Sequence, residues 1–312
     1  MITLWGLEWR IATIQNGIKE TLAYRGEFIL GILSNALVPV AIQLMLWNAI
    51  LKGDHSASFA GMNYPDLLAY TWTSLLFSQL RGGDLDFELI EMIRTGTLSN
   101  FLLRPVGPVE FIYFKGLGDK LLTLCLSLLL GLLATAFTSM TVAHLMMGLI
   151  LAMFGNVIAY LFGTILSTVA FYWENAFAIL IVKNMVVSLF CGELIPLTVV
   201  PEKYSYIWKS APFYLFVYGP SQVALGKWNE TVWLQQCGIA ILWIGVLATL
   251  NRLVWKLSIH RYQGIGDKNG RILGRFQDQL QEQSRSRIHL SNEYVRLDRC
   301  RFDLGFCGTR VF

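Results

Sequence analysis

Residues 121–172 read LLTLCLSLLLGLLATAFTSMTVAHLMMGLILAMFGNVIAYLFGTILSTVAFY and contain no Asp, Glu, Lys or Arg. One helix of this length would measure about 78 Å at about 1.5 Å per residue. The hydrocarbon layer of a membrane is only about 30 Å thick. The run therefore predicts two membrane-crossing helices that turn back at residues 138–144, and it indicates an all-α membrane protein.

The composition of the whole chain agrees with that class. Of its 312 residues, 54% are hydrophobic and 15% are charged, whereas soluble domains carry about 25% charged residues. A soluble globular protein is therefore excluded, and the net charge of +4 gives no reason to expect a nucleic-acid partner. The five cysteines form no C-x-x-C pair, so neither a disulfide framework nor a zinc site is expected.

We predict six transmembrane helices, at residues 28–51, 64–80, 121–137, 145–172, 176–200 and 231–255. The second contains Thr71, Thr73 and Ser74, and this polarity indicates a helix that faces protein or an aqueous path. Prolines interrupt residues 201–230, which predicts a re-entrant or interfacial hairpin packed against protein before the last span. The expected organisation is an N-terminal segment (1–27), a transmembrane domain (28–256) and a cytoplasmic tail (257–312).

Residues 1–27 have the pattern of an amphipathic helix. Apolar residues recur at three- and four-residue steps, at Leu4, Leu7, Ile11, Ile14, Ile18 and Leu22. We expect this helix to lie in the membrane interface; an ordinary soluble amphipathic helix is the alternative. The first apolar run starts at Phe28 without a small-residue cleavage pattern, so no cleavable signal peptide is expected.

Lysine and arginine set the expected orientation, because cytoplasmic segments carry the excess of these residues. With the N-terminus inside, the cytoplasmic segments hold 20 of them and the outer loops hold 4. We therefore predict a multi-pass protein of the inner or plasma membrane, with its N-terminus and C-terminus in the cytoplasm.

The polar connection at residues 81–120 contains a short amphipathic helix that Gly96 is placed to end. Phe87, Ile90 and Ile93 share one side of it. A transporter needs such a helix on its cytoplasmic side to receive motion from a soluble motor. A solvated connecting helix would have the same pattern, and both interpretations stay open at this point.

The run Ile-Arg-Thr-Gly-Thr-Leu-Ser-Asn-Phe-Leu-Leu-Arg-Pro at residues 93–105 resembles a stretch typical of the ABC-2 superfamily of exporter permeases. Residues 192–201 are similar to that group's fifth span and its exit, and Tyr-Gln-Gly at 262–264 to its usual end. The likeness covers residues 1 to about 266. The arginine-studded tail at 267–312 departs from the pattern.

The resemblance implies one permease half of an ATP-driven exporter. It would pair with a second permease, identical or different, and dock onto two ABC ATPase subunits, which would bind the ATP and Mg. This chain itself would bind no cofactor and be no enzyme. The amphipathic helix would be the coupling helix that contacts the ATPase, with the contact residues Asp86, Glu88, Glu91, Met92 and Arg94.

Two charged residues fall within the predicted fifth span. Lys183 and Glu193 are about 15 Å apart along a helix and about 80° apart around it, so a direct pair is not expected. Each is a functional candidate because burying a charge in a membrane is costly, but Lys183 would also fit a snorkelling side chain and Glu193 a hydrogen-bonded structural glutamate. The candidate substrate path or gate comprises Trp72, Phe190, Glu193 and Pro196.

Small residues recur every fourth position in the fourth span, at Gly155, Ala159, Gly163 and Ser167. This spacing lets helices approach closely. It predicts a packing surface and not a binding site.

Catalytic motifs are missing from the sequence. It contains no G-x-x-x-x-G-K phosphate loop, no G-x-S-x-G turn and no paired histidine motif for a metal. We therefore expect no catalytic or metal-binding residues and no ATPase activity in this chain. The expected function is export of an amphipathic or lipid-like substrate out of the cytoplasm or the inner leaflet, with membrane lipid as a further partner of the chain. A non-transporting scaffold or assembly protein is the alternative. The scattered histidines argue against a membrane-embedded transferase.

Overall fold

The computed structural model describes residues 2–51, 62–81, 85–103, 106–135, 141–173, 175–200, 203 and 211–262, and every element among them is a helix. The all-α prediction is therefore confirmed. The α-helices are α1 (Ile2–Ala23), α2 (Arg25–Ile50), α3 (Tyr64–Arg81), α4 (Leu85–Thr95), α5 (Leu98–Leu102), α6 (Pro108–Thr135), α7 (Val142–Ser167), α8 (Ala176–Phe190), α10 (Tyr218–Ala224) and α11 (Glu230–Ser258). The 3₁₀ helices include η1 (Thr168–Phe171), η2 (Leu197–Val199), η4 (Pro212–Leu215) and η5 (Ile259–Arg261).

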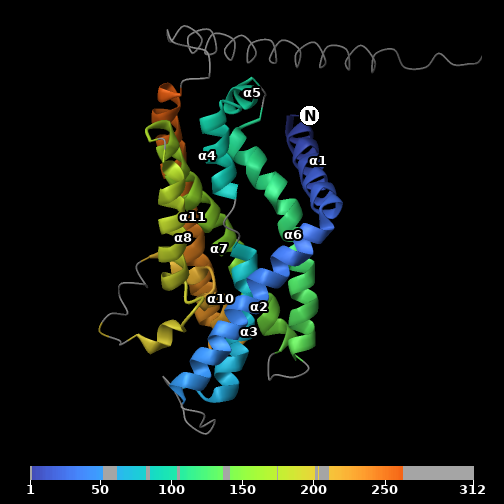
Figure 1. Cartoon of the computed structure of the whole chain (residues 1–312), viewed down its shortest axis with the longest axis vertical. Coiled ribbons are helices and arrows are strands. Elements are labelled where there is room, and N and C mark those ends of the chain that lie inside the picture. The colour runs from blue at the N-terminus through green and yellow to red at the C-terminus, as the bar shows by residue number, and fades with distance from the viewer. Residues whose placement is uncertain are drawn as a thin grey trace, which may run out of the picture.

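The long helices form an elongated bundle (Figure 1). The start of α1, α5 and the end of α11 with the following η5 lie at one end of its long axis, the top of Figure 1, which we term the upper end. The prediction that both termini face the cytoplasm requires this arrangement. Which side of a membrane the upper end faces stays a prediction.

Two helices in the described part are long and apolar enough to cross a membrane, Val142–Phe171 and Glu230–Arg261. They coincide with the predicted fourth and sixth spans. Val38–Ile50 and Ala176–Phe190 are shorter apolar helices in the regions of the predicted first and fifth spans. The total of six spans stays a prediction.

Two helices differ in length from the predicted spans. Helix α8 ends at Phe190, although the fifth span was expected to reach residue 200, because the chain turns at Gly192 with a φ of +78°. This left-handed conformation suits glycine and ends a helix. Helix α6 begins at Pro108 and not at residue 121, because proline is well suited to the first turn, where its missing N–H leaves no bond unmade.

Several predicted segments lie outside the described residues. They are the loop at 52–61, the end of the third span with its turn at 136–140, residues 201–202 and 204–210 of the predicted hairpin, and the tail at 263–312.

Helix α4 differs most from expectation. The sequence predicted a coupling helix or a solvated connecting helix on the cytoplasmic side. In the structure α4 packs against α6, α7 and α8 in the upper half of the bundle, above α3 (Figure 1). Asp86, Leu89, Ile90 and Ile93 are buried in it. The reason is that its apolar residues pack against neighbouring helices, while Asp86 pairs with Lys183 of α8.

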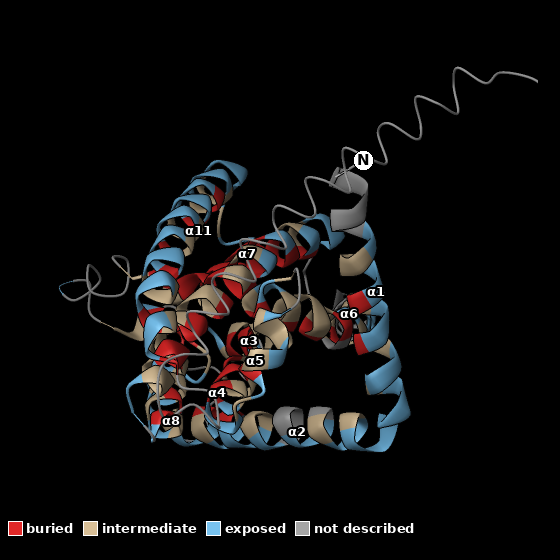
Figure 2. Ribbon diagram, turned by 90° about the horizontal axis from the view of Figure 1, so that it is seen from above, coloured by how far each residue is buried: buried red, intermediate tan, exposed pale blue. Residues whose placement is uncertain are grey.

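The second half of the predicted hairpin forms η4 and α10, which pack against α7. Leu215, Phe216 and Val217 are almost completely buried there. In Figure 2 the buried residues concentrate on α7 and its neighbours, whereas α2 and the outer side of α11 are largely exposed. The irregular backbone at 211–217 is thus covered by protein, as membrane depth would require.

Helix α1 packs along α6 through two glycines. A Cβ at Gly17 would lie 2.2 Å from the carbonyl oxygen of Lys115, and one at Gly118 would lie 2.6 Å from the backbone nitrogen of Ile18. Ile11 and Leu22 of the predicted apolar face remain exposed. From above, α1 and α2 form two adjacent sides of the outline (Figure 2). Whether α1 lies in a membrane interface stays a prediction.

Candidate functional site

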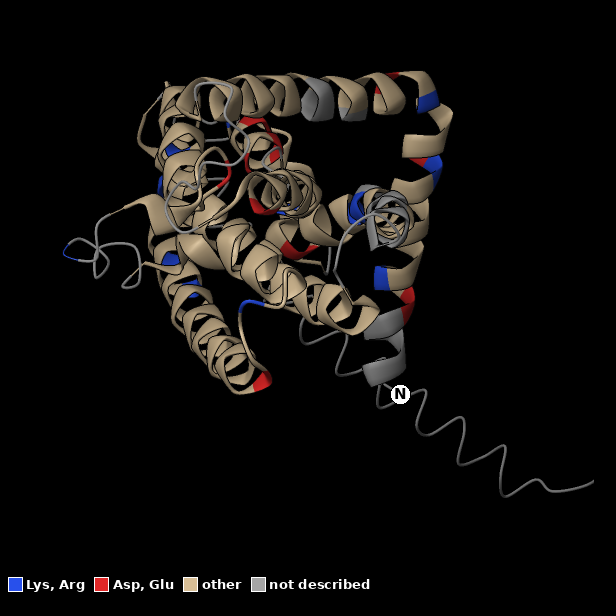
Figure 3. Ribbon diagram, turned by 90° about the horizontal axis from the view of Figure 1, so that it is seen from below, with Lys and Arg blue, Asp and Glu red and all other residues tan. Residues whose placement is uncertain are grey.

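Charged residues are sparse on the long helices, and they gather along α1 and inside the bundle (Figure 3). Two ion pairs inside the bundle connect α3 and α4 with α8 and the loop after it. A guanidinium nitrogen of Arg81, at the end of α3, lies 3.1 Å from a carboxylate oxygen of Glu193. Asp86 of α4 pairs with Lys183 of α8, and these side chains are only 5% and 8% exposed. We term these four residues the ion-pair cluster.

Lys183 and Glu193 were expected not to pair with each other, and each of them has a different partner. Removing one partner of a buried pair leaves an uncompensated charge and costs about 3–5 kcal/mol. The snorkelling interpretation of Lys183 does not fit its position, because its ammonium group contacts Asp86 inside the bundle. The cluster therefore connects α4 to α8 and α3 to the loop after α8.

Small residues on α7 make room for Asp86. A Cβ at Gly163 would lie 2.6 Å from a carboxylate oxygen of Asp86, and the Ser167 hydroxyl donates a 2.9 Å hydrogen bond to the Asp86 carbonyl. Further along α7, a Cβ at Gly155 would lie 2.6 Å from the Leu215 carbonyl oxygen. Three members of the predicted packing surface thus approach neighbouring elements closely, and the fourth, Ala159, is half-buried beside the pocket described below.

The five residues expected to contact an ATPase divide into two groups. Asp86 is buried, Glu88 lies 3.3 Å from Lys115, and Met92 is half-buried against the surrounding apolar cluster. Only Glu91 and Arg94 are exposed. The structure places the Asp86 side chain in the interior, where it pairs with Lys183. Contact of these five residues with an ATPase stays a prediction.

Asn156 of α7 holds the end of α3. Its amide nitrogen donates hydrogen bonds to the carbonyl oxygens of Leu80 at 2.7 Å and Arg81 at 3.2 Å. The last carbonyls of a helix have no partner within the helix, so this side chain allows α3 to end inside the bundle. Sequence analysis missed Asn156, although a polar residue in an uncharged span is a usable signal.

The loop after α8 is held by backbone and side-chain hydrogen bonds. The Tyr70 hydroxyl donates to the Gly192 carbonyl at 2.5 Å, and the Gln43 amide donates to the Glu193 carbonyl at 2.6 Å. The Tyr218 N–H donates to the Cys191 carbonyl at 2.9 Å. Helices α2, α3 and α10 therefore converge on residues 191–193.

The candidate gate residues are placed unequally. Phe190 is half-buried, Pro196 is buried and Glu193 belongs to the ion-pair cluster, so these three lie at the end of α8. Trp72 is exposed on α3, two positions after the tyrosine that binds Gly192. The neighbouring Leu194 and Ile195 are exposed apolar residues.

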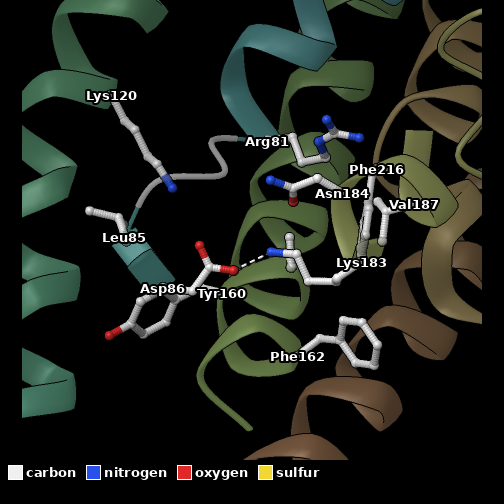
Figure 4. A pocket seen from close by; sticks show the side chains of 11 residues that line it. Arg81, Leu85, Asp86, Lys120, Tyr160, Phe162, Lys183, Asn184, Val187 and Phe216 are labelled. Atoms are coloured by element: carbon white, nitrogen blue, oxygen red, sulfur yellow. Dashed lines mark hydrogen bonds and ion pairs between the residues drawn. The ribbon is translucent and has the colours of Figure 1, made fainter. Parts of the chain in front are cut away.

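A pocket opens beside the Asp86–Lys183 pair (Figure 4). It encloses about 410 Å³ of empty space, counted with its opening. Its lining combines charged or polar side chains with apolar and aromatic ones: Arg81, Leu85, Asp86, Lys120, Ala159, Tyr160, Phe162, Lys183, Asn184, Val187 and Phe216. Such a lining suits a molecule with one polar and one apolar part. Among the described residues, no group of three or more His, Cys, Asp or Glu side chains is arranged to hold a metal ion.

Lys115 connects three elements near the upper end. Its ammonium nitrogen lies 3.4 Å from a carboxylate oxygen of Glu20 on α1 and 3.3 Å from one of Glu88 on α4. It precedes the predicted third span. Partial burial lowers its pKa, but the two carboxylates raise the pKa more, so that the net shift is upward. The lysine therefore stays charged and links α1, α6 and α4.

Comparisons with known proteins complete the description. A comparison with curated proteins finds no significant match. The family model described as ABC-2 family transporter protein matches residues 37–266, which include the ion-pair cluster, the loop after α8 and the pocket. Because the match covers most of the chain, this chain belongs to the ABC-2 family of transporter proteins.

Proposed function

We propose that this chain is the membrane-spanning subunit of an ATP-driven exporter. Membership of the ABC-2 family makes it a transporter permease. The sequence of 312 residues has no phosphate-binding loop. In this proposal separate ABC ATPase subunits bind Mg and ATP and hydrolyse the ATP. The cargo leaves the cytoplasm or the inner leaflet of the cell membrane.

The observation that carries the coupling mechanism is the position of α4. One end bears the exposed Glu91 and Arg94, and the other end bears Asp86, which pairs with Lys183 of α8. We term residues 95–99, which join α4 to α5, the α4–α5 corner. An ATPase that binds the exposed charges and this corner shifts α4 as a rod, and the ion pair transmits that shift to α8.

The gate in this proposal is the loop at residues 191–196. It follows α8 directly and is bound to α3 through the Arg81–Glu193 pair. A displacement of α8 against α3 alters that pair and moves the exposed Leu194 and Ile195. We expect an amphipathic or lipid-like cargo, since the exposed residues of this loop are apolar.

A second permease completes the transport path. Helix α8 exposes an apolar face formed by Ile181, Val182, Met185, Val186 and Leu189. Lipid or a second permease, identical or different, covers this face in the membrane. A subunit whose α8 moves at such an interface would open a path between the two halves.

Recovery of the partner tests this function. The chain is purified from its native membranes in mild detergent, and an ABC ATPase subunit is expected in the complex. Charge reversal at Glu91 and Arg94 should reduce recovery at least about tenfold, since hydrogen bonds to charged groups contribute about 1.5–3 kcal/mol each. Glu230→Lys, an exposed acidic residue where α11 begins, is the matched control.

The alternative of a scaffold or assembly protein makes the opposite prediction, because a scaffold would be purified without any ATPase. Orientation is tested separately with reporter fusions after Asn63, Pro105, His144 and Glu230. A reporter after Pro105 that lies outside the cell would refute docking at the α4–α5 corner. Rapid ATP-dependent release of a labelled lipid from vesicles holding the complex would support export.

A further inference from the structure

Tyr262 follows η5 directly and is the last residue that the structure describes. It is nevertheless only 5% exposed, and it packs in one apolar cluster with Leu89, Ile93 and Leu98. Its ring meets that of Phe171 edge to face, with 6.1 Å between the centroids. A buried tyrosine requires partners for its hydroxyl group, and these partners define what the residue does.

Both hydrogen bonds of the hydroxyl go to the α4–α5 corner. The hydroxyl donates to the Gly96 carbonyl at 2.8 Å and accepts from the Ser99 N–H at 3.2 Å. Gly96 has a φ of +78°, and its carbonyl also accepts bonds from the Ser99 hydroxyl at 2.5 Å and from the Ser99 N–H at 3.2 Å. The Ser99 N–H is therefore shared between the Gly96 carbonyl and the Tyr262 hydroxyl. Tyr262 therefore binds a carbonyl group at the end of α4 and an N–H group in the first turn of α5.

The corner has few other polar restraints from outside. Thr95 and Thr97 form local bonds, to the Glu91 carbonyl at 2.8 Å and between their hydroxyl oxygens at 3.0 Å. These bonds shape the turn but do not fix its direction relative to the bundle. The Tyr262 hydroxyl crosses 163 and 166 positions of sequence to reach it, so this hydroxyl fixes the corner to the end of α11.

We propose that Tyr262 is a positioning residue that orients the α4–α5 corner for the ATPase subunit. The proposal rests on the proposed function, because it assigns the corner to ATPase docking. The hydroxyl holds Gly96 and Ser99 in the geometry that the ATPase recognises, and it makes α11 move with α4 when the ATPase pushes. Coupling therefore reaches the bundle by two routes, through Asp86 to α8 and through Tyr262 to α11.

Tyr262→Phe tests the hydroxyl alone, because the ring and its packing against Phe171 remain. The probe is the ATPase subunit that co-purifies with the wild-type chain. We expect it to bind roughly tenfold more weakly, because the variant loses the hydrogen bonds that hold the corner in the geometry for binding. The permease-stimulated ATPase rate at saturating chain should fall at least about threefold. Tyr172→Phe is the matched control, since Tyr172 is 54% exposed and lies on the same stretch as Phe171.

Amide hydrogen exchange supplies a readout that is independent of the partner. In the wild type the Ser99 amide should be protected, and Tyr262→Phe should accelerate exchange across residues 96–102 at least about fivefold while α7 stays unchanged. A Ser99 amide that exchanges freely in the wild type overturns the proposal, as does a variant with wild-type binding, stimulation and exchange. Absence of any ATPase partner from the wild type would instead refute the proposed function.

Discussion

Two of the close contacts that helix α7 makes along its length bury different chemistry. Near its middle, Gly155 lies against the backbone carbonyl of Leu215. Two turns later, Gly163 lies against the carboxylate of Asp86, which pairs with Lys183. The first contact depends on shape alone. The second depends on shape and on a balancing charge from a third helix.

The difference indicates where the molecule is able to move. A backbone pressed against a glycine has no alternative arrangement, because any side chain or rotation meets main-chain atoms. An ion pair between two helices keeps its energy only while both partners meet. We therefore expect α7 with η4 and α10 to be the fixed part, and α4 with α8 to be the part that responds to a partner protein.

Removing the charge from Lys183 should have the largest effect on this comparison. Lys183→Met removes the lysine that pairs with Asp86 inside the bundle, and we expect a loss of about 3–5 kcal/mol in the free energy of unfolding. Unfolding in mild detergent, followed by tryptophan fluorescence, measures it. Lys256→Met, at an exposed position of α11, should cost little, and adding Asp86→Asn to the first variant should recover at least half. Equal stability of the Lys183 and Lys256 variants would contradict the buried pair.

Adding one methyl group tests the shape-dependent contact. Gly155→Ala should cost about 1–3 kcal/mol, because the Leu215 backbone has to shift. Gly163→Ala should cost at least as much, since its Cβ would meet the carboxylate, Cγ and Cβ of the buried Asp86 and displace it from Lys183. At Gly238 a Cβ meets nothing within 4 Å, so Gly238→Ala should be neutral or stabilise by up to about 1 kcal/mol. The same unfolding assay ranks the three variants, and a Gly155 variant as stable as the Gly238 variant would show that α7 has room there.

The Arg81–Glu193 pair should contribute less than the Asp86–Lys183 pair, because its side chains are 16% and 20% exposed and water replaces part of the interaction. Glu193→Gln should lower the free energy of unfolding by about 1–2 kcal/mol. The loop stays in place, because the side chains of Tyr70 and Gln43 still donate hydrogen bonds to its backbone carbonyls. Its effect on transport should exceed its effect on stability. Cargo release by vesicles that contain the ATPase complex gives the first quantity and thermal unfolding the second; an unchanged transport rate would remove Glu193 from the gate.

The contacts of Lys115 should have the smallest effect. Its side chain is 31% exposed, so the pairs with Glu20 and Glu88 together contribute at most about 1 kcal/mol. Lys115→Met should lower the free energy of unfolding by that amount in dilute buffer. In about 1 M salt the variant and the wild type should be equally stable, because charges more than about 3 Å apart are screened. Unfolding curves at both salt concentrations decide this. A loss that salt leaves unchanged would mean that packing of the lysine stem is responsible.

The sequence was sufficient for the class of the fold and for its longest apolar helices. An uncharged run longer than one membrane crossing has few alternatives, so α7 was expected close to its observed bounds. The apolar stretch at 231–255 likewise predicted α11. The packing surface on α7 was also expected, since small residues at a spacing of four have a direct steric meaning. Gly148 follows the same rule against the Pro220 carbonyl and was not predicted, because it lies seven positions before Gly155 and so outside the spacing of four.

The position of α4 was not predictable from local pattern. Carboxylates on a short amphipathic helix favour exposure to solvent. Asp86 is buried instead because it pairs with Lys183, which lies 97 positions further along the chain. The same holds for Tyr262 and Asn156, whose partners are backbone groups of distant helices. Long-range pairing of this kind leaves no periodicity in a single sequence, whereas burial of apolar faces does.

The contact of Gly17 and Gly118 has a practical consequence. With backbone against backbone at both positions, α1 has no freedom to roll or slide on α6, and the two helices travel together. A fluorophore attached at the exposed Asn16 would therefore report the displacement of α6 during each round of ATP hydrolysis. If the proposed function holds, such a label on α1 follows the movement of α6 without altering any residue of the ion-pair cluster.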